Sequence, residues 1–494
     1  MRHRLLEATG GFLLPFADQK GKPTHGLAAV AKHKERNMRD KILLPPVFGL
    51  GHSAGQVESE MDLDGKLVDS TWGRQTRSPA RIAFLHKSGL AKKYGLDFFQ
   101  RRHACRVDTL WREDLKLLHD HGVNGWRCSF NLPKINPAKG VFDVRELQRV
   151  RDMLDFANEL GIEVNPTIWW WDEPGWWDDI GSWESPTGDL IKYYGDIVYQ
   201  IMSRVGNRAT NIDTFNEPTV AAMFTRRWFR EGWPAQYVPN ARGEAPYRNM
   251  LYRIAEAHAV AVPIIREANP QAKIGIAHAA VWNQSDVPYL KQKWDEENFE
   301  MLKLLQEVGG KDIIDRVDLN IYMRRVQDLG KPERASWDGY VGYDEYPIRS
   351  APCEVTTGKP WGICPEALYH VSKEFWNEFG LEIRISEHGY PTDKDHEDHQ
   401  LWDAAMTIYW LDKAAREGVK IGGAFLWSML GNFEWGEGDF ADFGFFTRQR
   451  TPRPAMEFIR DCIQAGGITL EVWKKWESVL RKFPLPAEFL ATFE

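Results

Sequence analysis

The stretch Asp213-Thr214-Phe215-Asn216-Glu217-Pro218 gives the first indication of the fold. It closes a short, mostly apolar segment that begins at Asn211. Because proline has no N–H group to donate to a sheet, we predict a strand that stops before Pro218. Asn216 and Glu217 then lie at the carboxyl end of this strand, which is the end where barrel enzymes carry their catalytic groups.

A second segment far downstream repeats this design. Within Glu382-Ile383-Arg384-Ile385-Ser386-Glu387 a strand is predicted over residues 382–386, and His388-Gly389 stops the segment. The carboxyl ends of parallel barrel strands meet at one face of the barrel. We therefore predict that the side chains of Glu217 and Glu387 face each other across one cavity.

The rest of the chain alternates between strand and helix patterns. Amphipathic helices, such as the one predicted over residues 144–160 and stopped by Gly161, separate most of the strands. Several strands are nearly continuous apolar runs, as expected when both faces are buried. We predict an α/β fold, a single (β/α)8 TIM barrel with long βα loops, because the rival, a doubly wound open sheet, lacks a Gly-x-Gly-x-x-Gly after any strand. The eight predicted strands span residues 47–51, 125–130, 162–169, 211–216, 273–278, 317–322, 382–386 and 421–426.

The chain is expected to have two parts. Residues 1–45 lack clear periodicity and carry scattered lysines and arginines, which predicts a loosely packed N-terminal extension. Residues 46–494 are predicted to form the barrel, and residues 62–106 within it are predicted to be loops with a short helix. The tail is interpreted as a closing helix because apolar residues recur along it: Trp473, Trp476, Val479 and Leu480.

Composition argues against several classes of protein. The chain has 494 residues and a net charge of −7, so it lacks the basic footprint expected of a nucleic-acid-binding protein. No apolar run approaches the roughly 18 residues that a membrane span needs, and we identify no signal peptide. The oligomeric state stays open.

The cysteines and histidines predict neither a metal site nor a cofactor. The five cysteines are an odd number and form no Cys-x-x-Cys, which argues against a disulfide framework and favours the cytoplasm. A loop disulfide between Cys353 and Cys364 is the alternative. The histidines form no His-x-x-x-His pair, and His388 is interpreted as a packing or hydrogen-bonding residue.

Two carboxyl groups at strand ends suit the cleavage of a glycosidic bond. One carboxylic acid protonates the leaving oxygen, and one carboxylate attacks or stabilises the oxocarbenium-like carbon. A single glutamate after a strand is most often a solvated loop residue. Asn216-Glu217-Pro218 and Ser386-Glu387-His388 in one chain favour the catalytic interpretation, and the 22 tryptophans offer either core packing or flat platforms for sugar rings.

Five motifs, in chain order, resemble those of glycoside hydrolase family 1, the β-glucosidase and β-galactosidase family. Residues 214–218 resemble its acid/base motif, and residues 385–389 resemble its nucleophile motif, usually Thr-Glu-Asn-Gly. Residues 427–435 are similar to its sugar-binding motif, and residues 48–56 to its first strand. Arg127-Cys128-Ser129 stands where the family has Arg-Phe-Ser.

The resemblance implies a role for each matching residue. Glu217 would be the acid/base, Glu387 the nucleophile and Asn216 the partner of the sugar 2-hydroxyl. Tyr322 would hydrogen-bond the nucleophile, and Arg127 would keep it ionised, since a nearby cation lowers a carboxyl pKa. The charge on Glu387 would help raise the pKa of Glu217. The predicted substrate-binding residues are Gln56, Trp170, Trp171, Trp427, Glu434, Trp435 and Phe443.

Departures from the family pattern concern the sugar pocket and argue against a plain glucose glycone. Trp170 stands where the family has a His that binds a glycone hydroxyl, and an indole offers one donor and no acceptor. Gly431 replaces the usual Asp, and His388 replaces the Asn after the nucleophile. Asp439 and Asp442 stand where the family has Tyr and Arg. We also expect three tryptophans of the loop after the third strand to select the substrate: Trp176, Trp177 and Trp183.

Three functions fit these residues. The first is a retaining β-glycosidase that hydrolyses a small-molecule or oligosaccharide β-glycoside, β-glucoside- or β-galactoside-like or with a modified glycone, by double displacement. A transglycosylase would use the same carboxylate pair and pass the sugar to an acceptor. A non-catalytic carbohydrate-binding barrel would explain the changes at Trp170, Gly431 and Asp442. The joint presence of the five predicted catalytic residues argues against that third function.

Overall fold

The computed structural model describes residues 41–101, 104–185, 187–227, 233, 243–326, 348–353, 355 and 358–494. The predicted N-terminal extension lies outside these residues as far as position 40. The described fold belongs to the unit Asp40–Glu494. None of its described helices combines the length and the apolar character needed to cross a bilayer.

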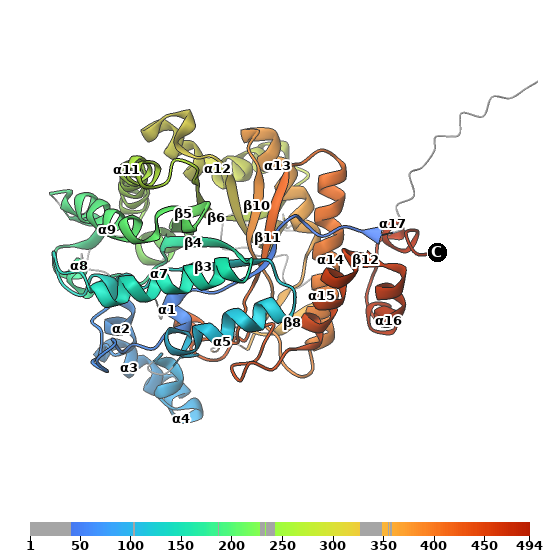
Figure 1. Ribbon diagram of the computed structural model, residues 1–494, viewed down its shortest axis with the longest axis horizontal. Helices are drawn as coiled ribbons and strands as arrows, with labels where there is room; N and C mark the ends of the chain where they lie inside the picture. The colour runs from blue at the N-terminus through green and yellow to red at the C-terminus, as the bar shows by residue number, and fades with distance from the viewer. Residues whose placement is uncertain are drawn as a thin grey trace, which may run out of the picture. The chain divides into compact units, whose positions relative to one another are not determined.

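Eight parallel strands of the described chain close into a barrel, which confirms the predicted (β/α)8 fold (Figure 1). Barrel strands that follow each other in the sequence are neighbours in the sheet, and β11 pairs with β2 to close the ring. Each strand overlaps one predicted segment. Their bounds are β2 (Phe48–Gly51), β3 (Gly125–Ser129), β4 (Glu163–Trp169), β5 (Asn211–Asn216), β6 (Lys273–Gln284), β7 (Val317–Val326), β10 (Ile383–His388) and β11 (Ile421–Trp427).

Helices cover the outside of this barrel (Figure 1). The contacts follow chain order, with α7 against β4, α11 against β5, α12 against β6, α13 against β7 and α14 against β11. The long helices are α5 (Val107–Asp120), α7 (Val144–Glu159), α9 (Asp189–Val205), α11 (Glu244–Ala268), α12 (Pro288–Gly309), α13 (Glu366–Phe379), α14 (Glu397–Arg416) and α15 (Pro454–Ala465).

Helix α7 shows how the sequence produces these elements. The Asp143 side chain accepts hydrogen bonds from the backbone N–H groups of Arg145 and Glu146, which caps the helix start. Its apolar stripe is buried, and Gly161 follows the helix with a φ of +73° that suits glycine. The stripe comprises Leu147, Val150, Leu154 and Ala157, as the sequence predicts.

The segment before α5 contains more structure than the sequence predicts. Residues 62–106 hold three helices, because Ser70 and Ser78 cap two of them and Gly89 begins the third. Leu85, Leu90 and Phe99 form a small apolar cluster of their own. The short helices of the described chain are α1 (Ala54–Val57), α2 (Thr71–Thr76), α3 (Pro79–Lys87), α4 (Leu90–Tyr94), α6 (Leu132–Ile135), α8 (Gly175–Asp179), α10 (Pro218–Ala222) and α17 (Ala487–Leu490).

Two small antiparallel sheets lie outside the barrel ring. One pairs β1 (Lys41–Ile42) with β12 (Ile468–Thr469), and the other pairs β8 (Arg349–Pro352) with β9 (Pro360–Gly362). The predicted closing helix is α16 (Leu470–Leu480). The five cysteines are buried and form no disulfide, so the alternative pairing of Cys353 with Cys364 is wrong.

Replacing Gly49 of β2 by alanine is expected to destabilise the barrel. A Cβ there would lie 2.5 Å from the carbonyl oxygen of Gly125 and 2.5 Å from the ring of Phe425. Overpacking of this kind costs about 1–3 kcal/mol, so the midpoint of urea unfolding should fall. Gly51→Ala is the matched control in the same strand, since its Cβ would come no closer than 3.5 Å to Trp427. Equal midpoints for the two variants would contradict this prediction.

Candidate active site

Glu217 lies at the turn between β5 and α10. Strand β5 ends at Asn216, as the sequence predicts, and Pro218 begins α10. The backbone of Glu217 has a φ of +43°, a left-handed conformation that side chains other than glycine seldom adopt. Its N–H donates to the carbonyl oxygen of Ala277 at 2.7 Å, which fixes this turn. Strain of this kind is typical of functional sites.

Glu387 lies within β10, which runs two residues beyond the predicted end of the strand. Arg127 Nη1 donates to Glu387 Oε1 at 2.6 Å. The Tyr322 hydroxyl donates to Glu387 Oε2 at 2.6 Å. Both carboxylate oxygens therefore have a strong donor, one of them cationic.

Two asparagines link the carboxyl groups. Asn320 Nδ2 donates to Glu217 Oε1 at 2.8 Å and to Asn216 Oδ1 at 3.1 Å. Asn216 Oδ1 also accepts from Arg127 at 2.8 Å, while Asn216 Nδ2 is buried without a partner among the described residues. Sequence reasoning missed Asn320 as a site residue. The signal was present, because Asn320 stands two positions before Tyr322 on the same face of a strand.

The two carboxyl groups differ in their surroundings. Burial, followed by the charge of Glu387, raises the pKa of Glu217 to about 8. Burial also raises the pKa of Glu387, against the lowering effect of Arg127 and Tyr322. Arg127 thus acts in the predicted direction, but desolvation exceeds its effect. Since Glu387 has a guanidinium and a phenol as donors and Glu217 has one amide, the pair loses its first proton from Glu387.

One cavity collects the predicted site residues at the carboxyl ends of the strands. Arg127 is the exception, because it is fully buried behind the cavity wall. The wall also includes Trp361 of β9, which has no sequence signal because it enters from outside the barrel. The predicted residues that line the cavity are Gln56, Trp170, Trp171, Asn216, Glu217, Tyr322, Glu387, Trp427, Glu434, Trp435 and Phe443.

A sequence model of the family described as Glycosyl hydrolase family 1 matches residues 43–307 and 303–467. The chain belongs to this family. Membership makes it a glycoside hydrolase.

Similar proteins cover most of the chain. A Beta-glucosidase from Agrobacterium sp. is 24% identical over 430 residues, which are 81% of this chain and 89% of that protein. A Beta-galactosidase from Sulfolobus acidocaldarius is 25% identical over 376 residues, which are 69% of this chain and 74% of that protein. The structure of a family 1 β-glucosidase from Thermotoga maritima aligns with a TM-score of 0.71 at 23% identity, over 87% of this chain and 99% of that one.

Trp170, the expected replacement for the family 1 histidine, directly follows β4. Its ring stacks on Trp427, with ring centres 5.4 Å apart and planes inclined by 30°. The guanidinium carbon of Arg127 lies 4.0 Å from the centre of the same indole. The indole is therefore held between a tryptophan and a cation, an arrangement that stabilises both partners.

Gln56 presents an acceptor to the cavity. Its Nε2 donates to Asn432 Oδ1, to the Phe433 carbonyl oxygen and to Glu434 Oε2, at 2.8 to 3.1 Å. Its Oε1 is buried without a partner among the described residues. A buried acceptor left in this way suits a ligand hydroxyl.

Two of the departures from the family 1 motif form one unit. A Cβ on Gly431 would lie 2.5 Å from Asp442 Oδ1, so the carboxylate occupies the space of the missing side chain. Asp442 in turn pairs with Arg453 at 2.8 Å. His388 Nδ1 donates to the Ile321 carbonyl oxygen, and its Nε2 hydrogen-bonds with Asp403 Oδ1, so His388 is a buried hydrogen-bonding residue.

The expected role of the three loop tryptophans is wrong. Trp177 and Trp183 are buried in the core, and Trp183 Nε1 donates to the buried Glu173. Trp176 Nε1 donates to the Asn136 carbonyl oxygen, and none of the three lines the cavity. Trp171 takes that place instead, and its Nε1 donates to the Asn216 carbonyl oxygen at 3.0 Å.

Replacing Glu217 by glutamine is expected to stabilise the fold, and more so at higher pH. The folded chain keeps this proton up to about pH 8, whereas the unfolded chain releases it near the ordinary pKa of 4.5. Between these values the free energy of unfolding falls with rising pH, by at most about 1.4 kcal/mol per unit. Glutamine does not titrate and escapes this loss.

Thermal unfolding of the wild type and of Glu217→Gln, between about pH 5 and about pH 8, measures the difference in their stability. The matched control is Glu267→Gln, an exposed carboxyl on α11. A stability difference between Glu217→Gln and the wild type that does not widen with pH would contradict the prediction.

Proposed function

We propose that this family 1 protein is a retaining β-glycosidase with Glu387 as nucleophile and Glu217 as acid/base. The observation that carries the proposal is the unequal environment of two carboxyl groups on one cavity. Glu387 is bonded to a guanidinium and a phenol, while burial raises the pKa of Glu217 to about 8. An ionised nucleophile beside a protonated acid is the starting state of double displacement.

The chemistry proceeds in two steps. Glu387 attacks the anomeric carbon. The bond between that carbon and the leaving oxygen breaks, and Glu217 gives its proton to the leaving oxygen. A covalent glycosyl-enzyme results, with Glu217 now ionised. Glu217 then takes a proton from water, the water oxygen attacks the same carbon, and Glu387 leaves as a carboxylate. Two displacements return the β configuration.

The proposed glycone contacts come from groups around the cavity. Asn216 Nδ2, which is buried without a partner among the described residues, would donate to the 2-hydroxyl. Gln56 Oε1 and the Glu434 carboxylate would accept from other hydroxyls, and Trp427 would stack under the ring. The printed activities of the relatives favour a β-glucoside-like or β-galactoside-like substrate. Trp170 favours a glycone that is modified or unhydroxylated at one position.

A transglycosylase is the second candidate. The aromatic and apolar part of the cavity wall favours it, since such surfaces hold an acceptor sugar and exclude water. Analysis of products formed with and without an added acceptor separates transfer from hydrolysis. This part of the wall comprises Met223, Phe224, Trp233 and Trp361.

Glu387→Gln is expected to abolish turnover of an aryl β-glycoside. Loss of the nucleophile should lower kcat/KM by at least about 10⁴-fold, because the covalent step is gone. For the wild type, NMR of the first-formed sugar should show the β anomer. Undiminished hydrolysis by the variant, or an α anomer from the wild type, would remove the retaining assignment. Sugar binding by the wild type without any turnover would revive the binding-barrel alternative.

Azide rescue distinguishes the two roles from a general loss of folding. In Glu387→Gly, azide enters the vacated space and attacks the activated aryl glycoside, which gives the α-glycosyl azide. In Glu217→Gly, azide attacks the glycosyl-enzyme from the opposite side and gives the β-glycosyl azide. The same anomer from both variants would contradict the assigned roles.

Deoxy substrates are expected to reveal the sugar position that faces Trp170. The 2-deoxy glycoside should lose at least about 100-fold in kcat/KM, because Asn216 is left unpaired. One other deoxy position should lose less than about tenfold, because an indole is a weak anchor for a hydroxyl. Kinetics on a monodeoxy aryl glycoside series measures this pattern.

Trp170→His should make the tolerant position discriminating, since imidazole both donates and accepts. Trp361→His is the matched control, a cavity tryptophan that enters from β9. It should leave the deoxy pattern as in the wild type. Equal losses at every position in both wild type and Trp170→His would overturn the role given to Trp170.

A further inference from the structure

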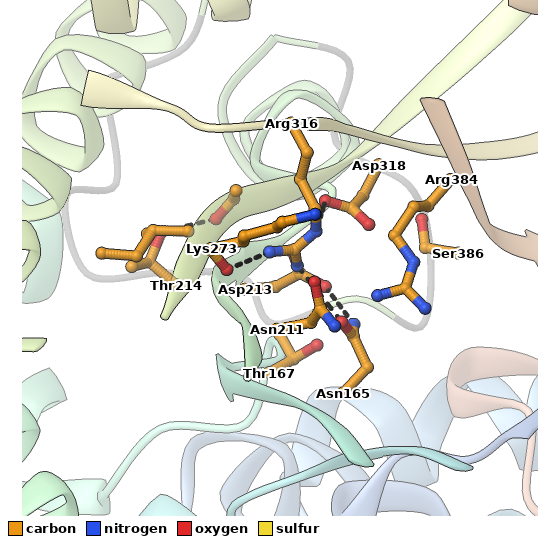
Figure 2. A network of polar contacts seen from close by, with 12 residues as sticks. Asn165, Thr167, Asn211, Asp213, Thr214, Lys273, Arg316, Asp318, Arg384 and Ser386 are labelled. Atoms are coloured by element: carbon orange, nitrogen blue, oxygen red, sulfur yellow. Dashed lines mark hydrogen bonds and ion pairs between the residues drawn. The ribbon is translucent and has the colours of Figure 1, made fainter. Parts of the chain in front are cut away.

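A network of polar contacts and ion pairs joins residues of several barrel strands (Figure 2). Arg316, just before β7, places its Nη2 2.7 Å from Asp213 Oδ1 on β5. Its Nε lies 2.8 Å from Asp318 Oδ2. Arg384 of β10 pairs with Glu163 of β4 at 2.6 Å. Arg316, Asp213 and Asp318 have no exposed surface.

The backbone makes room for this network. A Cβ on Gly275 of β6 would lie 2.5 Å from Asp318 Oδ2 and 3.3 Å from Asp213 Oδ1. Glycine therefore leaves the space that the two carboxylates fill. Asn165 of β4 donates to Asp213 Oδ2 at 2.8 Å and accepts from Arg316 at 3.2 Å (Figure 2). Asp213 is thus held from β4 and from the start of β7.

Asp213 also reaches the arginine that contacts Glu387. Its Oδ2 lies 3.9 Å from Nε of Arg127. The terminal nitrogens of Arg127 are committed to the cavity, because Nη1 donates to Glu387 and Nη2 to Asn216. Nε has no hydrogen-bond partner among the described residues. Asp213 is accordingly the anion on the remaining edge of this guanidinium.

Two carboxylates compete for the charge of Arg127. A buried charge without a partner costs several kcal/mol, so an Asp213 without its own cation would draw Arg127 away from Glu387. Arg316 supplies that cation at 2.7 Å, while Arg127 stays 3.9 Å away. Asp213 can therefore orient Arg127, while most of the positive charge of Arg127 remains available to Glu387.

We propose that Asp213, held by Arg316 and Asn165, is a positioning residue for the reaction. It fixes the Nε edge of Arg127 and thereby keeps Nη1 on Glu387 and Nη2 on Asn216. The inference rests on the proposed role of Glu387 as nucleophile.

The sign of a pH effect separates positioning from simple electrostatics. Removing the charge of Asp213 directly makes Glu387 easier to ionise, which moves the acidic limb of kcat/KM to lower pH. Releasing Arg127 has the opposite effect, since Glu387 loses its cation. The charged or titratable groups around Glu387 are Arg127 of β3, Glu217 at the end of β5, Tyr322 of β7 and Glu434 after β11. Those around Asp213 are Arg127, Arg316, Asp318, His258 of α11 and, beside Asp318, Arg384.

Asp213→Asn keeps the shape of the side chain and removes its charge. We expect kcat/KM on an aryl β-glycoside to fall about 10- to 100-fold, mainly through kcat, because the nucleophile contacts lose their alignment. The acidic limb should move to higher pH by about half a unit or more. Steady-state kinetics across the pH range, with circular dichroism to verify folding, measures both effects.

Asp318→Asn is the matched control. It removes the other buried carboxylate on Arg316, 2.8 Å away, but does not touch Arg127. Its acidic limb should stay where the wild type has it. The proposal would be overturned if the acidic limb of kcat/KM in Asp213→Asn stays in place or moves to lower pH. Equal shifts of this limb in both variants would also overturn it.

Arg316→Lys provides a second route if Asp213→Asn does not fold. It keeps the positive charge but loses the fork that spans Asp213 and Asp318, so Asp213 should pull on Arg127 and the acidic limb should again rise. An unmoved limb would contradict the inference. Failure of the proposed function is seen separately, as turnover that survives in Glu387→Gln.

Discussion

The ion pair between Arg127 and Glu387 is the interaction on which the cavity depends. Its atoms are 2.6 Å apart, and the two side chains are 0% and 6% exposed. A buried pair of this kind depends on further hydrogen bonds to its remaining donors and acceptors. Tyr322 satisfies the second carboxylate oxygen and Asn216 the second guanidinium nitrogen. These groups stand on β3, β5, β7 and β10, so the pair exists only because the barrel closes and brings non-adjacent strands across one interior.

The barrel was predictable because several strands are short apolar runs and helical patterns separate most of the strands. Pro218 marks the end of β5, and the two glutamates follow from the rule that barrel loops at the carboxyl ends carry function. Strands β6 and β7 extend well beyond their predicted ends, to Gln284 and Val326. Beyond the barrel ring the two strands continue as a ladder of their own, from Val281 paired with Met323 to Gln284 paired with Val326.

The ionic network could not be predicted from the sequence. Asp213, Arg316 and Arg384 sit in or beside strands, where single charged residues usually indicate a solvent-facing edge. Asp213 with Arg316, and Arg384 with Glu163, are pairs far apart in the sequence that become neighbours only after closure. Figure 2 shows the first of these pairs. The same limit applies to Gly431 and Asp442, which look like two separate losses in the sequence and form one packed unit in the structure. The expected role of the three loop tryptophans was wrong for a different reason. Composition alone does not distinguish a platform for a sugar from core packing.

Trp170 affects both the proposed sugar pocket and the surroundings of Arg127. As the expected replacement for a family 1 histidine, it would remove a hydrogen-bonding anchor for the sugar. In the structure it also covers the face of Arg127, at 4.0 Å, and so shields from water the cation that serves Glu387. Shielding strengthens the attraction between Arg127 and Glu387, because both charges then interact through a less polar medium. In the proposed site, the side chain that would weaken one sugar contact therefore reinforces the electrostatics of Glu387, the proposed nucleophile. The rebuilt pocket and the retained ion pair are consequently parts of one arrangement, and a substitution at Trp170 acts on both.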